Sequence, residues 1–255
     1  MRIFRGTLTL CEHTYFASRE LGIVYQTEPL IGNYALAYAL GLCHAPYRWG
    51  GGPRYREDLS PVNLQGIYVT PATFAQDTVR FAVTQFNAQS DSYRTLFTNN
   101  AIVAPGSREV PVRDGQRWSV VNVDTGGRRR VNPTNFPQSG KIRMLAFGSQ
   151  ATFYLLDGQA TARRPGYIRL GKFNSKARID WTEQSWKDAE GELRIPLFLN
   201  AVDLPPTVDL QLLAYNQISI HPAPLIRDIH AVGRHYQLAD GAALPVGMRF
   251  GVEAL

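Results

Sequence analysis

The sequence predicts a single α+β domain, and three observations support this fold class. Segments of alternating apolar and polar residues, typical of strands, recur along the chain, while one segment has the composition and end signals of a helix. No internal repeat and no low-complexity linker divides the 255 residues. The apolar content of 44% and charged content of 19% are those of an ordinary globular chain with enough material for a core. One elaborated domain over residues 1–255 is therefore expected.

The N-terminal part of the chain contains the clearest elements. Residues 2–10 (RIFRGTLTL) alternate as a strand does. A helix is expected over residues 27–41, because Thr27 can cap its start, Pro29 suits its first turn and Gly41 suits the position just past its end.

The rest of the chain is predicted to be mostly strands and turns. Residues 47–57 (YRWGGGPRYRE) should form a loop, because they contain three glycines and a proline. Residues 110–133 have hairpin character, with Asp-Gly and Gly-Gly as turn signals, and the apolar segment 141–158 could be strand or helix. Further strands are expected at 66–72, 78–86, 94–103, 193–202 and 208–220.

The charge of the protein is unevenly distributed. Residues 101–178 hold fourteen cations and four anions, whereas residues 179–255 hold five cations and ten anions. Arginine outnumbers lysine by 23 to 4, and its planar guanidinium suits bidentate contacts with phosphate and stacking on bases. A polyanionic partner, most simply a nucleic acid, is favoured over a basic surface that only aids solubility.

Several other classes of protein are disfavoured. Cys11 and Cys43 cannot form a disulfide framework and are expected to be small buried residues in a reducing compartment. The N-terminus lacks the apolar region of a signal peptide, and no apolar segment approaches the ~18 residues of a membrane span, so a cytoplasmic protein without membrane contact is expected. Gly166–Lys172 has P-loop spacing, but Phe173 offers no hydroxyl for Mg²⁺. No metal site and no cofactor is predicted.

Residues 167–181 (YIRLGKFNSKARIDW) carry the most specific signal for phosphate binding. Ile168 and Leu170 put the apolar face on even positions, whereas Phe173, Ala177, Ile179 and Trp181 put it on odd positions, and the phase changes at Gly171. We interpret the segment as one strand with a bulge or break at this glycine. Its polar face would then comprise Arg169, Lys172, Asn174, Lys176 and Arg178. Such a row of cations predicts a phosphate track, and Gly171 would let backbone N–H groups approach an anion.

Two further basic segments are candidate RNA-binding sites. Arg128, Arg129 and Arg130 come directly after the second turn of the predicted hairpin. Arg48 and Arg54 lie in the 47–57 loop among aromatic residues, a mixture typical of grooves that bind single strands.

Four segments resemble one known family. YFASRELG (15–22), TEPLIGNYALAYAL (27–40), YIRLGKFNSKARI (167–179) and LPVGMRFG (244–251) are similar, in this order, to the small RAMP subunit of type I-D CRISPR effector complexes, the subtype I-D member of the fifth Cas family. The similarity covers most of the chain outside about residues 90–140, and GKFNSKAR, which includes Ser175, is its most specific part.

The resemblance implies a modified ferredoxin-like (RRM-like) fold with an inserted β-hairpin thumb, at about residues 105–140, and additional C-terminal strands. It also implies a role in antiviral defence within a Cascade-type ribonucleoprotein. The subunit would bind the 5′ handle of the guide RNA and cap the backbone filament. Its neighbours would be a backbone RAMP subunit and the large polymerase-like subunit that reads the PAM, with target DNA near the PAM reached through the assembled complex.

The resemblance to subtype I-D favours a protein that is not an enzyme, with no catalytic residue, because a separate endonuclease is expected to process the guide precursor. The alternative is a metal-independent ribonuclease that uses His230, His235 or a tyrosine, with Lys172 steadying the phosphate. These histidines lie far in sequence from the cationic segment, and nothing in the sequence shows that the two converge.

Overall fold

The computed structural model describes residues 1–16, 18–21, 24–43, 45, 52–87, 106–115, 117–131 and 139–254. These residues form mainly β-structure. Nineteen strands accompany two α-helices, α1 (Asn33–Leu40) and α2 (Tyr55–Leu64), and two 3-10 helices, η1 (Ala201–Asp203) and η2 (Val252–Ala254), in this part of the chain. The predicted α+β class therefore overestimates the helical part. The chain divides into two compact units, one of residues 1–20, 26–83 and 143–255, the other of residues 21–25 and 84–142.

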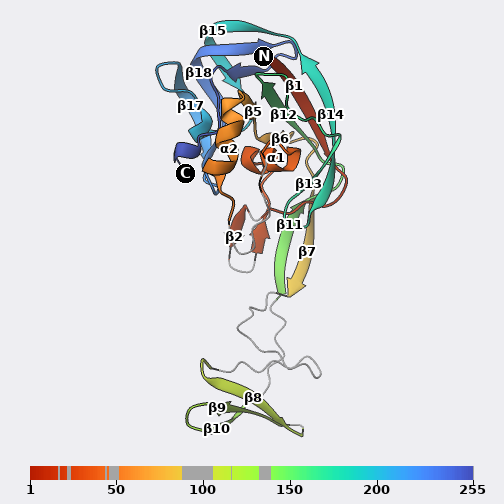
Figure 1. Ribbon diagram of the computed structural model, residues 1–255. Helices are drawn as coiled ribbons and strands as arrows, with labels where there is room; N and C mark the ends of the chain where they lie inside the picture. Colours follow the sequence, from red (N-terminus) through yellow and green to blue (C-terminus); the bar gives the residue numbers. More distant parts are fainter. Residues whose placement is uncertain are drawn as a thin grey trace. The chain divides into compact units, whose positions relative to one another are not determined.

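The first unit is built on a seven-stranded sheet of order β13-β14-β1-β12-β6-β4, with β5 paired to β12. Both helices pack on this sheet (Figure 1), where α1 contacts β5 and β13, and α2 contacts β5. The bounds of the strands are β1 Arg2–Leu10, β4 Leu30–Ile31, β5 Ile67–Val69, β6 Ala72–Phe74, β12 Gln150–Asp157, β13 Tyr167–Leu170 and β14 Ser175–Gln184. The predicted opening strand is thus confirmed and lies inside the sheet, between β14 and β12.

The packing at the centre of this sheet requires a glycine on β1. Gly6 on β1 is the register partner of Phe153 on β12 and of Trp181 on β14. The two rings meet edge to face over the glycine, with centroids 5.3 Å apart. A Cβ at residue 6 would lie 2.3 Å from the Phe153 ring, so a glycine is required for the rings to fill this part of the core.

A second sheet of the first unit is organised around the long strand β18, which pairs with β15, β16, β17 and β19, all antiparallel. The strands are β15 Trp186–Ile195, β16 Leu199–Asn200, β17 Leu210–Ile218, β18 Leu225–Leu238 and β19 Ala243–Pro245. The apolar residues on alternate positions of β18, such as Ile229 and Ala231, belong to the same core cluster as those of β1.

Helix α1 starts six residues later than the sequence predicted. Gly41 ends it in a left-handed conformation, as expected (φ 68°), but Leu30–Ile31 pair with β6 as strand β4, and Gly32 precedes the helix. The hydroxyl of Thr27 donates to the carbonyl of Phe16 (2.8 Å) and caps nothing. Tertiary strand pairing has therefore overridden the capping pattern.

The predicted 47–57 loop is only partly described, and the described part ends in a helix. Residues 46–51 lie outside the described chain, while α2 begins at Tyr55 and contains Pro61. Leu59 and Val62 are buried against the core, and the acidic residues Glu57 and Asp58 occupy the first turn, where a helix favours negative charge. The loop prediction is wrong for residues 55–57, because the neighbouring glycines concealed this pattern.

A fully buried carboxylate ties the end of the chain to the core. Asp203 accepts hydrogen bonds from the Asn33 amide (2.5 Å), the hydroxyls of Tyr34 (2.9 Å) and Tyr68 (3.0 Å), and the backbone N–H of Gly251 (2.7 Å). Burial raises the pKa of Asp203 to about 6, although these four hydrogen bonds favour the ionised form. The cluster fixes the start of α1 and the C-terminal segment to the same point.

The second unit contains a three-stranded antiparallel sheet of order β10-β9-β8, with β8 Glu109–Asp114, β9 Arg117–Asn122 and β10 Arg128–Val131. Both predicted turns are present, and Trp118, Val120 and Val131 form a small core. A four-stranded sheet, β2-β3-β11-β7, contains the strands at which the chain passes between the units. These strands are β2 Arg19–Leu21, β3 Val24–Gln26, β7 Phe81–Asn87 and β11 Ser139–Leu145.

Other expectations have mixed outcomes. The apolar segment 141–158 forms strands, and the strand expected at 94–103 lies outside the described residues. Cys11 is exposed and Cys43 is half-buried, so the expectation of two buried cysteines is wrong. None of the helices in the described segments is long and apolar enough to cross a membrane.

Candidate nucleic-acid interface

The segment 167–181 is a hairpin and not one interrupted strand. β13 and β14 are joined by a four-residue turn, residues 171–174, and pair antiparallel, with Ile168 opposite Ala177 and Arg169 opposite Lys176. Because the chain reverses, its inward positions change from even to odd numbers, which is the phase change seen in the sequence. The strand does break at Gly171, one of the two predicted alternatives, but the chain reverses there, so the interpretation as one strand with a bulge is wrong. The inference that the cations share a face holds for the two strands.

The outer face of the hairpin gathers four residues. Arg169 and Lys176 are cross-strand neighbours, and Tyr167 lies opposite Arg178 in the same register, so all four side chains project to one side. All four are exposed. Lys172 and Asn174 lie in the turn at the end of this face and are exposed as well.

Two of these cations have acidic neighbours. Arg169 lies 3.7 Å from the Glu12 carboxylate and donates to the carbonyl of Asn174 (3.0 Å), while Arg178 pairs with Asp180 at 3.1 Å. Lys172 and Lys176 form no ion pair with any described residue. An external anion can therefore bind to these two lysines without displacing an acidic side chain of the protein.

Exposed aromatic rings lie among the cations, a feature the sequence analysis missed. The Lys176 ammonium lies 4.4 Å from the ring centroid of Tyr167, and Phe173 lies 5.3 Å from the ring of Tyr15. Tyr167 and Phe173 are each 56% exposed. A continuous strand would put Phe173 on the apolar face, whereas the turn directs it outward. Exposed rings beside lysines are typical of surfaces on which the bases of single strands stack.

Three residues of the predicted site have structural roles. Gly171 has φ 69°, and a Cβ there would lie 2.5 Å from the Tyr15 carbonyl oxygen, which also accepts the N–H of Lys172 (2.9 Å). That N–H is therefore already used inside the protein. The Ser175 side chain is buried and donates to the carbonyl of His13 (2.6 Å). These contacts hold the turn against residues 13–15.

The three consecutive arginines do not share a face. Arg128 and Arg130 lie on one side of β10, and Arg129 lies on the other side, opposite Val120 of the small core. Arg129 is paired with Glu109 at 3.0 Å and Arg128 with Asp114 at 3.4 Å, whereas Arg130 has no ion pair with a described residue. The Arg128 and Arg130 side also carries Val110 and Val112, each 37% exposed.

Of the two candidate arginines in the 47–57 segment, the structure describes Arg54 but not Arg48. Arg48 lies outside the described residues. Arg54 is exposed and directly precedes α2, where its carbonyl accepts the N–H of Asp58 (2.9 Å).

The sequence match to a protein family decides the identity of the chain. The family model described as "Type I-D CRISPR-associated protein Cas5/Csc1" matches residues 1–253. The chain belongs to this family. As a Cas5/Csc1 protein it is a subunit of a CRISPR ribonucleoprotein, and the resemblance predicted from its four segments is confirmed.

Two other comparisons add little to the Cas5/Csc1 assignment. No curated protein sequence matches the chain. A chain in the cryo-EM structure of the type III-B Cmr-beta complex bound to cognate target RNA and AMPPnP is 11% identical, with a TM-score of 0.37 over 90% of this chain and 84% of that chain. This is a weak likeness, and the family assignment rests on the sequence match alone.

His230 and His235 of this Cas5/Csc1 protein lie on opposite faces of strand β18. His230 and His235 lie five residues apart on the regular part of β18, so their side chains project to opposite faces at roughly 16 Å along the strand. His230 contacts Glu192 at 2.6 Å, and His235 is buried with Nδ1 3.0 Å from the Gly233 carbonyl. In the described part of the chain no group of three or more His, Cys, Asp or Glu side chains could hold a metal ion.

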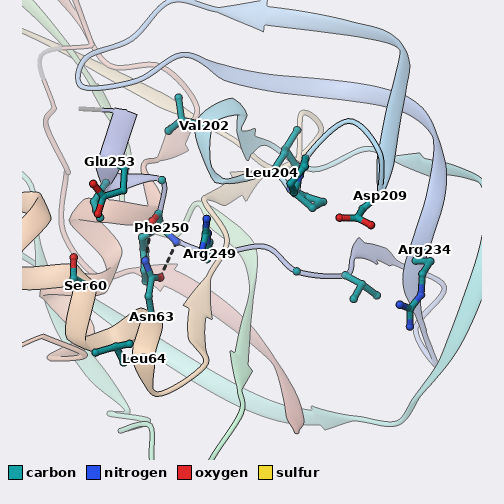
Figure 2. Close-up of a pocket in the computed structure, with 16 residues that line it drawn as sticks. Ser60, Asn63, Leu64, Val202, Leu204, Asp209, Arg234, Arg249, Phe250 and Glu253 are labelled. Atoms are coloured by element: carbon teal, nitrogen blue, oxygen red, sulfur yellow. Dashed lines mark hydrogen bonds between the residues drawn. The ribbon is translucent and has the colours of Figure 1, made fainter.

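A cavity of about 810 Å³ lies between α2, η1 and the C-terminal segment of the Cas5/Csc1 chain (Figure 2). Asn63 fixes one wall, since its amide both donates to and accepts from the backbone of Phe250 (2.9 Å each). Its charged lining has both signs, with Arg234 and Arg249 against Asp209 and Glu253. This balance makes the cavity less suited to a polyanion than the β13–β14 hairpin.

Proposed function

We propose that this Cas5/Csc1 protein is the non-catalytic subunit that binds the 5′ handle of the guide RNA in a type I-D effector complex. It would cap the backbone filament and help to position the large subunit for recognition of target DNA near the PAM. The observation that carries the proposal is the outer face of the β13–β14 hairpin. There, unpaired Lys172 and Lys176 stand beside the exposed rings of Tyr167 and Phe173. Phosphates would contact the lysines, and bases would stack on the rings.

We further propose that the β8–β10 sheet is the thumb, at about residues 105–140, inserted in a modified ferredoxin-like fold that forms one functional domain over residues 1–255. In the described residues β8, β9 and β10 pair with one another and with no other strand, and all three belong to the second unit. Its face with Arg128, Arg130, Val110 and Val112 combines cations with exposed apolar groups. Such a face suits RNA or the adjacent backbone subunit.

The two sides of β10 provide a matched test of the thumb. Arg128→Glu with Arg130→Glu should weaken assembly with guide RNA and the backbone subunit, whereas Arg129→Glu reverses an arginine already paired with Glu109 on the core side. Assembly is measured by co-purification, with circular dichroism as the folding control. Limited proteolysis should also show that this segment is cut in the isolated protein and protected in the complex. Equal assembly by the two folded variants would contradict the thumb assignment.

Strand β17 supports a contact with another protein subunit. In the described structure it pairs with β18 alone, and its nine residues, LQLLAYNQI, contain no charged residue and no proline. Leu213 and Tyr215 are 50% and 48% exposed. Edge strands of independent proteins are normally protected by charge or proline, so an uncharged edge with exposed apolar groups is typical of a surface that a partner covers.

The role of β17 can be separated from RNA binding. Leu213→Lys should reduce co-purification with the large or backbone subunit while leaving the affinity of the isolated protein for handle RNA unchanged. Leu64→Lys is the control, because Leu64 is 85% exposed and belongs to α2 and not to the β17 edge. An equal loss of assembly in both variants, or no loss in either, would argue against β17 as the protein contact.

The non-catalytic assignment is supported by the placement of the two C-terminal histidines on opposite faces of β18. General acid–base cleavage needs two proton-transfer groups at one phosphate, and His230 and His235 cannot reach one together. Incubation of the purified protein with repeat RNA in EDTA tests this assignment. Specific cleavage within the repeat would favour the ribonuclease alternative.

A further inference from the structure

A second cavity, of about 300 Å³, opens beside the turn of the β13–β14 hairpin in the first unit. Its lining includes Phe16, Ser18 and Glu20, the start of α1, Tyr55 at the start of α2, Asn200, and residues 220–223 with Leu225. Lys172 from the hairpin turn lines it as well. The same lysine therefore belongs both to the proposed phosphate-binding face and to this cavity.

The cavity has aromatic walls that are fixed in place. Phe16, Tyr34 and Tyr55 line it, and the Tyr55 ring lies 5.1 Å from Tyr34 and 6.2 Å from Tyr38. The Tyr34 hydroxyl is held by Asp203, so neither this ring nor its neighbour needs to rearrange to receive a ligand. Tyr55 is half-buried, and this burial raises the pKa of its phenol, which stays neutral. Flat, preformed apolar walls are suited to a planar ring.

The polar lining is also preorganised. Asn33 and Asn200, both buried, are joined by a hydrogen bond of 3.2 Å from the Asn200 amide to the Asn33 carbonyl. At the mouth, Ser18, Glu20 and His221 offer hydrogen-bonding groups that the edge of a base can use. The cavity thus combines planar apolar walls with polar groups around the rim, as sites for planar heterocycles do.

The charges of the lining favour an anion beside Lys172. Lys172 is the cation of the lining, and it forms no ion pair with a described residue. Glu20 is the carboxylate of the lining and lies on the side formed by residues 16–20. A phosphate is therefore favoured beside Lys172, and a base edge that donates hydrogen bonds is favoured toward Glu20.

We propose that this cavity receives one unstacked nucleobase of the RNA strand whose phosphates follow the β13–β14 hairpin, with the phosphate of that nucleotide on Lys172. This inference rests on the proposed handle-binding function and adds to it a site for a single base. A volume of about 300 Å³ is at the lower end for ligand sites and is large enough for a single base. A flipped base would fix the register of the RNA on the protein, which phosphate contacts alone do not do.

Ala35 allows a test that does not remove a wall of the cavity. It lies in the first turn of α1, lines the cavity and is exposed, so Ala35→Trp adds bulk at the mouth without disturbing the core. Leu64→Trp, on an exposed position of α2 outside this cavity, is the control for added bulk. The probe is a synthetic single-stranded RNA with the handle sequence of the repeat, carrying 2-aminopurine at each position in turn. Affinity is measured by fluorescence anisotropy with the full-length protein.

If the proposal holds, one handle position changes its 2-aminopurine fluorescence far more than the others on binding, and ultraviolet irradiation cross-links the RNA to Tyr55 or Phe16. Ala35→Trp should remove that signal and weaken binding by about 5- to 100-fold, the range for one lost base stack, while Leu64→Trp does neither. Normal binding and an unchanged fluorescence pattern in Ala35→Trp would overturn the base site.

The test also separates this inference from the proposed function. If reversal of Lys172 and Lys176 weakens RNA binding and Ala35→Trp does not, the base site fails and handle binding stands. If neither change has an effect, handle binding by the hairpin fails as well. Free AMP, GMP, CMP and UMP form a further arm. If one of them binds tightly, and binding is lost in Ala35→Trp while RNA affinity is kept, the cavity serves a free nucleotide and the proposal is wrong.

Discussion

Charge reversal of the two unpaired lysines tests the proposed RNA face most directly. In the Lys172→Glu and Lys176→Glu double variant no ion pair within the described protein is lost, because neither lysine has an acidic partner. Lys176 is the cross-strand neighbour of Arg169, so the wild-type hairpin holds two like charges directly opposite each other. Glutamate at this position would convert a repulsive pair into an attractive one. This gain is offset by the lost contact of Lys176 with the Tyr167 ring and by the nearby Glu12 carboxylate, which accepts the Lys176 N–H, so we expect thermal stability to change little while RNA binding falls.

The size of the loss follows from the exposure of the side chains. Both lysines are exposed, so each contact with a phosphate is worth the ~0.2–1 kcal/mol of a surface ion pair, and reversal adds a repulsion of similar size. Reversal at both positions should then reduce the binding free energy for RNA by about 1–4 kcal/mol, which corresponds to roughly a 5-fold to several-hundred-fold higher Kd. Loss of two phosphate contacts should also lower the slope of log K against log salt by about 1.4, at ~0.7 for each contact with a single strand.

Fluorescence anisotropy with labelled handle RNA, titrated between about 50 and 200 mM salt, measures both quantities. The matched control is Lys187→Glu with Arg194→Glu, which makes the same change in net charge on exposed positions of β15. The control should shift the affinity weakly and leave the salt slope unchanged. An unchanged slope in the folded hairpin variant, or an equal change in both variants, would refute the phosphate contacts assigned to Lys172 and Lys176.

Three further predictions concern stability and chemistry. Burial raises the pKa of Asp203 from 3.8 to about 6, so the folded protein binds a proton more tightly than the unfolded chain. The free energy of unfolding of the wild type should therefore fall by on the order of 2 kcal/mol as pH rises from about 4 to 6. Urea titrations should show that this fall is absent from Asp203→Asn. Gly171→Ala should destabilise the protein by about 1–3 kcal/mol, which is more than Gly148→Ala. Both glycines have positive φ, but of these two only at residue 171 would a Cβ lie 2.5 Å from a carbonyl oxygen. Equal melting temperatures of the two variants would contradict this prediction. Alanine at His230 and His235 together should leave guide-RNA processing by a reconstituted complex unchanged, and uncut precursor on a gel would show the opposite.

Local sequence patterns were sufficient for elements whose signals lie within a few residues. The alternation of residues 2–10 gave β1, Gly41 marked the end of α1, and the Asp-Gly and Gly-Gly pairs marked the turns of the β8–β10 sheet. The resemblance carried by four separate segments was enough for the family, which the match over residues 1–253 confirms. Each of these signals depends on backbone preferences or on residue identity, and neither requires knowledge of which segments meet in space.

Contacts between distant segments decided the rest. Residues 27–32 have helix-start signals, but Leu30 and Ile31 within them pair with β6 instead, because strand pairing there satisfies backbone groups beside a buried core. The change of apolar phase at Gly171 is compatible with a bulge or a reversal, and the antiparallel pairing of β13 with β14 shows that it is a reversal. That turn directs Phe173 outward and brings Lys172 to the cavity at the start of α1. Residue order alone shows which residues are basic, whereas tertiary packing controls which of them face a ligand, since side-chain direction depends on partners more than a hundred residues away.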